Sequence, residues 1–169
     1  MREITMRMLH LPFGEENQDD RIEFVTDGRL YERAGSIYLI YDETELSGTP
    51  GCTTSLRLKD GSLRMKRSGK DVGYNTEILF EKGKHYLSEY ETPYGSLDVD
   101  VLTNDVRHTR AEDGSFRIDV DYQISLGGAE TQRDTLAIEV NNVSEEKSEE
   151  GVPEWERTVG EKENAEERL

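Results

Sequence analysis

The sequence predicts an all-β protein in which about eight to ten antiparallel strands form an up-and-down meander that closes into a barrel. Apolar and polar residues alternate without interruption over 116–126, and a period of two puts one set on a buried face. Asp-Gly pairs at 27–28, 60–61 and 113–114 are typical of tight hairpins. Short links make neighbours in sequence neighbours in space, and closure removes exposed sheet edges. A two-sheet sandwich is the alternative architecture.

The predicted strands follow one another with few residues between them. They lie near residues 4–11, 20–27, 29–34, 36–44, 52–60, 62–68, 74–81, 84–91, 95–108 and 115–140, the last with a break at 127–132.

Each strand is justified by its own alternation or by the turn that bounds it. The Asp27-Gly28 pair separates the second strand from the third, and Asp60-Gly61 separates the fifth from the sixth. Lys82-Gly83-Lys84 and Gly127-Gly128 mark two later reversals. Alternating apolar positions support the remaining strands: Ile37, Leu39, Tyr41; Leu56, Leu58; Leu63, Met65; Thr76, Ile78, Phe80; Leu97, Val99, Val101; Leu136, Ile138, Val140.

The composition indicates one folded domain with an acidic tail. The chain has 169 residues, of which 33% are hydrophobic and 34% charged, and a formal net charge of −16. The boundary falls near Val143, because 144–169 is rich in glutamate and has few apolar residues to bury. Residues 1–143 are the predicted barrel domain, and 144–169 is predicted to be a disordered or weakly helical tail. The alternative for the tail is a docking peptide centred on Trp155.

The charge and cysteine content exclude several function classes. Strong negative charge opposes nonspecific binding to nucleic acid and to anionic membranes. One cysteine, Cys52, excludes an internal disulfide framework and a multi-cysteine zinc site. The start has no secretory apolar run, and no apolar stretch is long enough for a transmembrane helix. We therefore expect a cytoplasmic protein.

No motif indicates catalysis, a cofactor or a metal. His10, His85 and His108 lie far apart and share no ligand spacing with Cys52. Nucleophile elbows, phosphate-binding glycine loops and His-Glu-x-x-His pairs are missing from the sequence. We therefore expect a protein that is not an enzyme.

Two charged residues occupy positions expected to face inward. Arg67 follows Leu63 and Met65 at every second position of its strand, and Glu43 follows Leu39 and Tyr41 in the same way. We call this shared alternation the parity of a strand. A buried guanidinium needs a carboxylate or a bound anion. Three interpretations stay open: an internal Arg67–Glu43 ion pair, the polar end of a ligand cavity, or a strand that ends early and turns Arg67 outward.

The tyrosines offer further candidates for a ligand site. Most of the eight lie within or beside predicted strands, where half-buried packing explains them. Tyr41, Tyr90 and Tyr94 lie nearest to Arg67 and Glu43 in the predicted meander. These five residues form the candidate ligand-binding set.

Several short motifs together resemble a known family. They are Gly35 to Glu43, Thr53 to Leu58, Arg67 to Gly69, Leu79 to Gly83, Tyr90 to Gly95, and Leu102-Thr103. Their order and spacing resemble the YwiB-like proteins over roughly residues 2–142. That resemblance implies a calycin-like β-barrel, similar in outline to lipocalins, with no assigned function and no catalytic residue to carry over.

Two functions remain from the sequence. The first is a non-catalytic barrel that binds or senses a small molecule. The alternative is a barrel with a filled lumen that meets a protein partner or a second copy of itself through its surface, the basic strand pair from Arg57 to Lys66, or the acidic tail. An internal cavity lined by Arg67, Glu43 and tyrosines would favour the first.

Overall fold

The computed structural model describes residues 1–13 and 21–141, and this part of the chain consists of strands and turns. The strands are β1 (Arg2–Pro12), β2 (Ile22–Arg33), β3 (Ser36–Asp42), β4 (Thr53–Lys59), β5 (Ser62–Gly69), β6 (Tyr74–Phe80), β7 (His85–Thr92), β8 (Gly95–Arg110), β9 (Phe116–Leu126) and β10 (Gln132–Asn141). The predicted tail, 144–169, lies outside the described residues.

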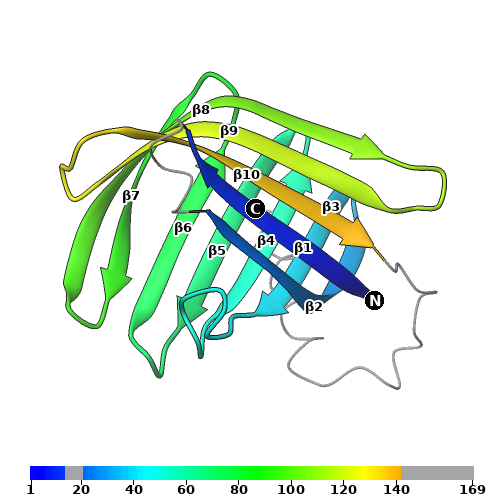
Figure 1. Cartoon of the computed structure of the whole chain (residues 1–169), viewed down its shortest axis with the longest axis horizontal. Helices are drawn as coiled ribbons and strands as arrows, with labels where there is room; N and C mark the ends of the chain where they lie inside the picture. The colour runs from blue at the N-terminus through cyan, green and yellow to red at the C-terminus, as the bar shows by residue number, and fades with distance from the viewer. Residues whose placement is uncertain (14–20, 142–169) are drawn as a thin grey trace.

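The strands form a closed antiparallel barrel, as predicted (Figure 1). Each strand pairs with its neighbours in sequence, and β1 closes the ring against β10, from Thr5 opposite Asn141 to Pro12 opposite Asp134. Consecutive strands run in opposite directions. Each end of the barrel therefore contains the starts of every second strand and the ends of the strands between them. Residues far apart in sequence therefore meet at one end of the lumen.

The Asp27-Gly28 pair was predicted to be a hairpin turn, and this prediction is wrong. Both residues lie within β2, which runs unbroken from Ile22 to Arg33. A Cβ atom on Gly28 would lie 2.9 Å from the Met6 sulfur and 3.1 Å from the Ile40 carbonyl oxygen. The glycine therefore permits close packing inside the barrel, while Ala34 and Gly35, both with positive φ, form the turn.

The other predicted turns are confirmed. Asp60 and Gly61 have φ values of 51° and 77° and join β4 to β5 as a two-residue hairpin. Gly114 and the Gly127-Gly128 pair also have positive φ, between β8 and β9 and between β9 and β10.

One half of the lumen is packed with apolar side chains. Inward residues from the start of β1, the end of β4 and the start of β5 meet there, and Leu63 is completely buried. Their neighbours in the same cluster are Ile4, Leu30, Leu39, Leu56, Leu58, Phe116, Ile118, Ile138 and Val140. This half holds the barrel together through burial of apolar surface.

β6 and β7 are joined more loosely than other neighbours. Along the full length of these two described strands, the register contains a single pair, Asn75 opposite Glu91. The turn between the strands bonds to β8 instead, because the Gly83 amide donates to the Thr103 carbonyl over 2.8 Å. The two strands are therefore held to each other by one registered pair and by the turn that joins them.

Candidate functional site

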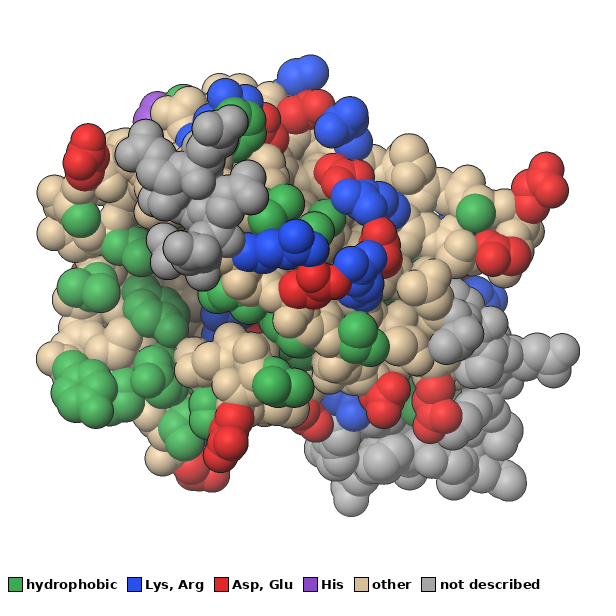
Figure 2. Space-filling model, in the orientation of Figure 1, with side chains coloured by type: hydrophobic (Ala, Val, Ile, Leu, Met, Phe, Trp, Pro, Cys, Tyr) green, Lys and Arg blue, Asp and Glu red, His purple; other side chains and the backbone are tan. Residues whose placement is uncertain are grey.

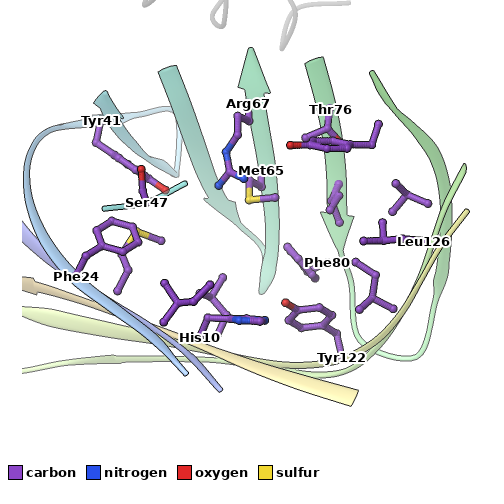
Figure 3. Close-up of a pocket in the computed structure, with 17 residues that line it drawn as sticks. His10, Phe24, Tyr41, Ser47, Met65, Arg67, Thr76, Phe80, Tyr122 and Leu126 are labelled. Atoms are coloured by element: carbon purple, nitrogen blue, oxygen red, sulfur yellow. The ribbon is translucent and has the colours of Figure 1, made fainter. Parts of the chain in front are cut away.

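The other half of the lumen is hollow. It holds a cavity of about 340 Å³, at the small end of the range for ligand sites. Figure 3 shows Met65 and Arg67 of β5 on one side of this cavity, with His10 and Tyr122 opposite. The lining residues are Met8, His10, Ile22, Phe24, Tyr41, Ser47, Met65, Arg67, Thr76, Ile78, Phe80, Tyr90, Val99, Tyr122, Ile124, Leu126 and Leu136.

Strand alternation accounts for the cavity's apolar walls. Most lining positions lie toward the ends of β1, β3, β5, β7 and β9 and the starts of β2, β8 and β10, where inward residues meet at one end of the barrel. The lining residues of β6 extend to its last residue, Phe80, and Ser47 lies in the loop between β3 and β4. Phe80 and Tyr122 pack with ring centroids 5.0 Å apart. Ile22 and Leu126, exposed by 46% and 44%, form an apolar rim.

Arg67 and Glu43 form an ion pair within the barrel. The Arg67 Nε donates to Glu43 Oε1 over 3.1 Å and lies 3.0 Å from the Thr54 hydroxyl. The Thr54 hydroxyl also donates to Glu43 Oε1, over 2.5 Å. The Glu43 side chain is fully buried, whereas that of Arg67 is 22% exposed and lines the cavity. Of the three sequence interpretations, the internal pair is confirmed and an outward Arg67 is wrong.

Burial and the neighbouring groups act in opposite directions on Arg67. Burial is the largest single influence and would lower the pKa of Arg67, but the Glu43 carboxylate together with Tyr41 and Tyr90 outweighs it, so the pKa lies above its ordinary value. Burial raises the pKa of Tyr41, and the neighbouring Glu43 charge raises it further. Both groups therefore keep their protons: the guanidinium stays cationic and the phenol stays able to donate a hydrogen bond.

Two more tyrosine hydroxyls belong to the same cavity. Burial raises the pKa of Tyr90, and the Arg67 charge offsets part of that rise. Burial also raises the pKa of Tyr122, and the Asp134 charge adds to it. The lumen thus offers neutral phenol hydroxyls beside the permanent cation Arg67.

Comparison with known proteins gives a family. Residues 11–138, more than half of the chain, match a family described as "Domain of unknown function (DUF1934)". The chain belongs to this DUF1934 family. No match was found among curated proteins.

A solved structure shares the DUF1934 barrel. The crystal structure of the YwiB protein from Bacillus subtilis matches with a TM-score of 0.66 and 21% identity, covering 83% of this chain and 93% of that one. The match shows the same fold, and the YwiB-like resemblance of the sequence motifs is confirmed.

The DUF1934 barrel of this chain brings together three of the five predicted site residues at the cavity wall. Arg67, Tyr41 and Tyr90 line it, and Glu43 lies behind Arg67. Tyr94 does not join them. It lies in the turn between β7 and β8 and is 95% exposed, because the strand ends before it and its side chain has no wall to pack against. The structure removes Tyr94 from the candidate site.

Sequence reasoning missed a second polar pair in the lumen. His10 lines the cavity, and its Nε2 lies 3.0 Å from Oδ2 of the buried Asp134. Both positions follow the inward parity of their strands: His10 continues Met6 and Met8, and Asp134 precedes Leu136 in step. The parity rule that found Arg67 would also have found this pair.

The described residues contain neither a metal cluster nor a membrane-spanning helix. No group of three or more His, Cys, Asp or Glu side chains within 1–13 and 21–141 could hold a metal ion. Over the same part of the chain, no helix is long and apolar enough to cross a membrane. On the barrel's outer face, Arg64 of the basic strand pair bonds to Glu77 over 2.5 Å.

Proposed function

We propose that this protein is a non-catalytic binding barrel that holds a small, mainly apolar molecule in its lumen. The cavity carries the proposal: about 340 Å³ of space between apolar walls, with the Arg67 guanidinium at its edge. Apolar walls with a few fixed polar groups are typical of small-molecule sites. The apolar rim of Ile22 and Leu126 suits the passage of such a molecule.

The polar groups of the lumen favour binding over catalysis. A hydrolytic site would need a nucleophile in contact with a general base. Ser47, the one serine among the described residues of the cavity wall, instead donates its hydroxyl to the Thr44 carbonyl over 3.0 Å. His10 is engaged with Asp134. These groups can fix the orientation of a bound molecule.

A fluorescence titration with the neutral probe N-phenyl-1-naphthylamine tests the proposal on the full chain. We expect saturable binding at one site. Ile124→Trp should abolish it, because Ile124 lines the cavity and the indole would fill the space. Leu87→Trp is the matched control, since Leu87 is 74% exposed on the outer face of β7, and this variant should bind normally.

Two results would contradict binding in the lumen. Equal binding by both tryptophan variants would place the probe on the outer surface. If the probe shows no saturable binding, and native mass spectrometry of protein purified from its own cell finds no retained small molecule, the lumen is not a binding site. The surface-acting alternative, a barrel that meets a protein partner, would then replace the proposal.

A further inference from the structure

The two polar pairs of the lumen lie on opposite walls. Arg67 belongs to β5 and Asp134 to β10. In the closed ring of described strands, β10 is five places from β5 in either direction. Figure 3 shows the same arrangement, with Arg67 across the cavity from His10.

In both pairs the buried carboxylate also accepts a hydrogen bond from a further side chain. At the first, Glu43 Oε1 accepts from Arg67 and from Thr54, and Glu43 Oε2 is buried without a hydrogen-bond partner among the described residues. At the second, Asp134 is only 4% exposed. Its Oδ1 accepts from the Gln132 amide over 2.8 Å, and its Oδ2 faces His10. Each wall therefore holds a carboxylate that is removed from water.

Apolar residues separate the two pairs and keep the local dielectric low. Met8, Phe80 and Val99 are among the buried side chains that line this space. Charges interact strongly in such surroundings, and an ion without a matching partner is costly.

The balance of charge among the described lumen residues disfavours another anion. These residues set one cation, Arg67, against two carboxylates, Glu43 and Asp134. The net charge of these described lumen groups is therefore −1 when His10 is neutral and zero when His10 is protonated. A carboxylate ligand would make it −2 or −1, inside a protein whose formal charge is already −16. An uncharged ligand adds no such cost.

We propose that the lumen selects an uncharged, mainly apolar molecule that presents a hydrogen-bond acceptor to Arg67, and that it disfavours anionic amphiphiles of the fatty-acid type. This inference rests on the proposed binding function and specifies its ligand class. Arg67 acts as a neutralised donor, since its charge is balanced by Glu43 behind it.

Two probes with the same aromatic body test this selectivity. N-phenyl-1-naphthylamine is neutral, and 8-anilinonaphthalene-1-sulfonate carries one negative charge on the same skeleton. We expect the neutral probe to bind the full chain at least about tenfold more tightly. Equal affinity, or tighter binding of the sulfonate, would overturn the charge selectivity while leaving lumen binding intact. Failure of both probes to bind would overturn the proposed function instead.

Two substitutions test whether the charge in the lumen causes this selectivity. Asp134→Asn removes one lumen carboxylate, so the affinity for the sulfonate should rise about threefold or more relative to the neutral probe. Asp121→Asn is the matched control: it changes the net charge equally, but Asp121 pairs with Arg133 outside the lumen. Should the control shift the ratio as much, the selectivity comes from the protein's overall charge, and the proposal fails.

A second lumen variant guards against a folding defect in the first. Glu43→Gln removes the other buried carboxylate and should shift the probe ratio in the same direction as Asp134→Asn. If circular dichroism shows both variants to be folded and neither alters the ratio, lumen charge does not set the selectivity.

Discussion

At the scale of single residues, Arg67 and Glu43 differ in their access to water. The Glu43 side chain is fully buried, while that of Arg67 is 22% exposed toward the cavity. Loss of Arg67 would leave a buried carboxylate without its cation, although Thr54 would still donate to it. Loss of Glu43 would leave a guanidinium that still reaches the cavity. The two single substitutions should therefore have unequal costs.

A double-mutant cycle measures this inequality. Arg67→Met should lower the free energy of unfolding by roughly 3–5 kcal/mol, since it leaves a buried charge unmatched. Glu43→Gln should cost less, and the double variant should recover much of the loss of Arg67→Met. Denaturant unfolding gives all three values. Additive losses, or a cost below about 1 kcal/mol for Arg67→Met, would contradict the internal pair.

Parity along a strand predicts which residue faces the lumen, and it predicted Arg67 and Glu43 correctly. It could not predict that Gly28 lies inside β2, because an Asp-Gly pair has the same sequence whether it turns or packs against Met6 and Ile40. It also could not predict the cavity. An empty space depends on whether the summed side-chain volumes fill the barrel, and alternation carries no information on that.

On the outer face of the barrel, the pKa of Asp121 also depends on the residues that bond to its carboxylate. Asp121 of β9 accepts two bonds from Arg133 of β10, at 3.0 and 2.7 Å, and one from the Asn104 amide. The hydrogen bond from Arg133 is the main reason that the pKa of Asp121 lies below its usual value. A carboxyl with a depressed pKa stabilises the fold above its unfolded pKa, and this contribution is lost as the pH falls through the folded pKa.

Asp121→Asn should therefore have an effect that depends on pH. We expect a Tm lower than that of the parent by roughly 2–4 °C at pH 7, and a difference that shrinks as the pH falls below the ordinary aspartate pKa and through the lowered pKa of folded Asp121. Asp98→Asn, on the exposed part of β8, is the control and should change the Tm little at either pH. A Tm difference for Asp121→Asn that is constant with pH would rule out the linkage.

At the scale of elements, the strands of the barrel differ in how well each is held. β9 pairs along its length with both β8 and β10, whereas β7 pairs fully with β8 and at one position with β6. The sequence placed β6 and β7 correctly, because alternation reports each strand by itself. It did not report that the two strands pair at a single position, because alternation carries no information on pairing between strands.

Native-state hydrogen exchange should detect the weak pairing between β6 and β7, which we call the β6–β7 seam. Alternate amides of β7 face β8 and β6, and those facing β6 lack the ladder bonds that slow exchange. We expect them to exchange roughly a hundredfold or more faster than the amides of β9. Uniform protection across β7 and β9 would mean that the β6–β7 seam is closed in solution.

At the scale of the whole molecule, the two ends of the barrel differ in how completely they are packed. The packed half buries residues such as Leu63, Ile118 and Val140, and so supplies the stability that a hollow half cannot. Figure 2 shows hydrophobic side chains gathered on the side of the molecule where β7 and β8 lie, and Leu87 is among the most exposed of the described ones. A cavity costs stability, and the proposed binding function would account for that cost.

Ring closure also predicts which part of the chain the fold can lose. The last strand, β10, pairs with β1 as far as Asn141, and the ring is complete there. Deletion of 146–169 should therefore leave the Tm within a few degrees of the full chain, measured by thermal unfolding followed by circular dichroism. Deletion of 132–169 is the contrasting variant: it removes β10 and leaves β1 and β9 with open edges, so cooperative unfolding should disappear. A Tm drop above about 8 °C for the shorter deletion would show that the segment beyond the barrel docks onto it and stabilises it by more than ~2 kcal/mol.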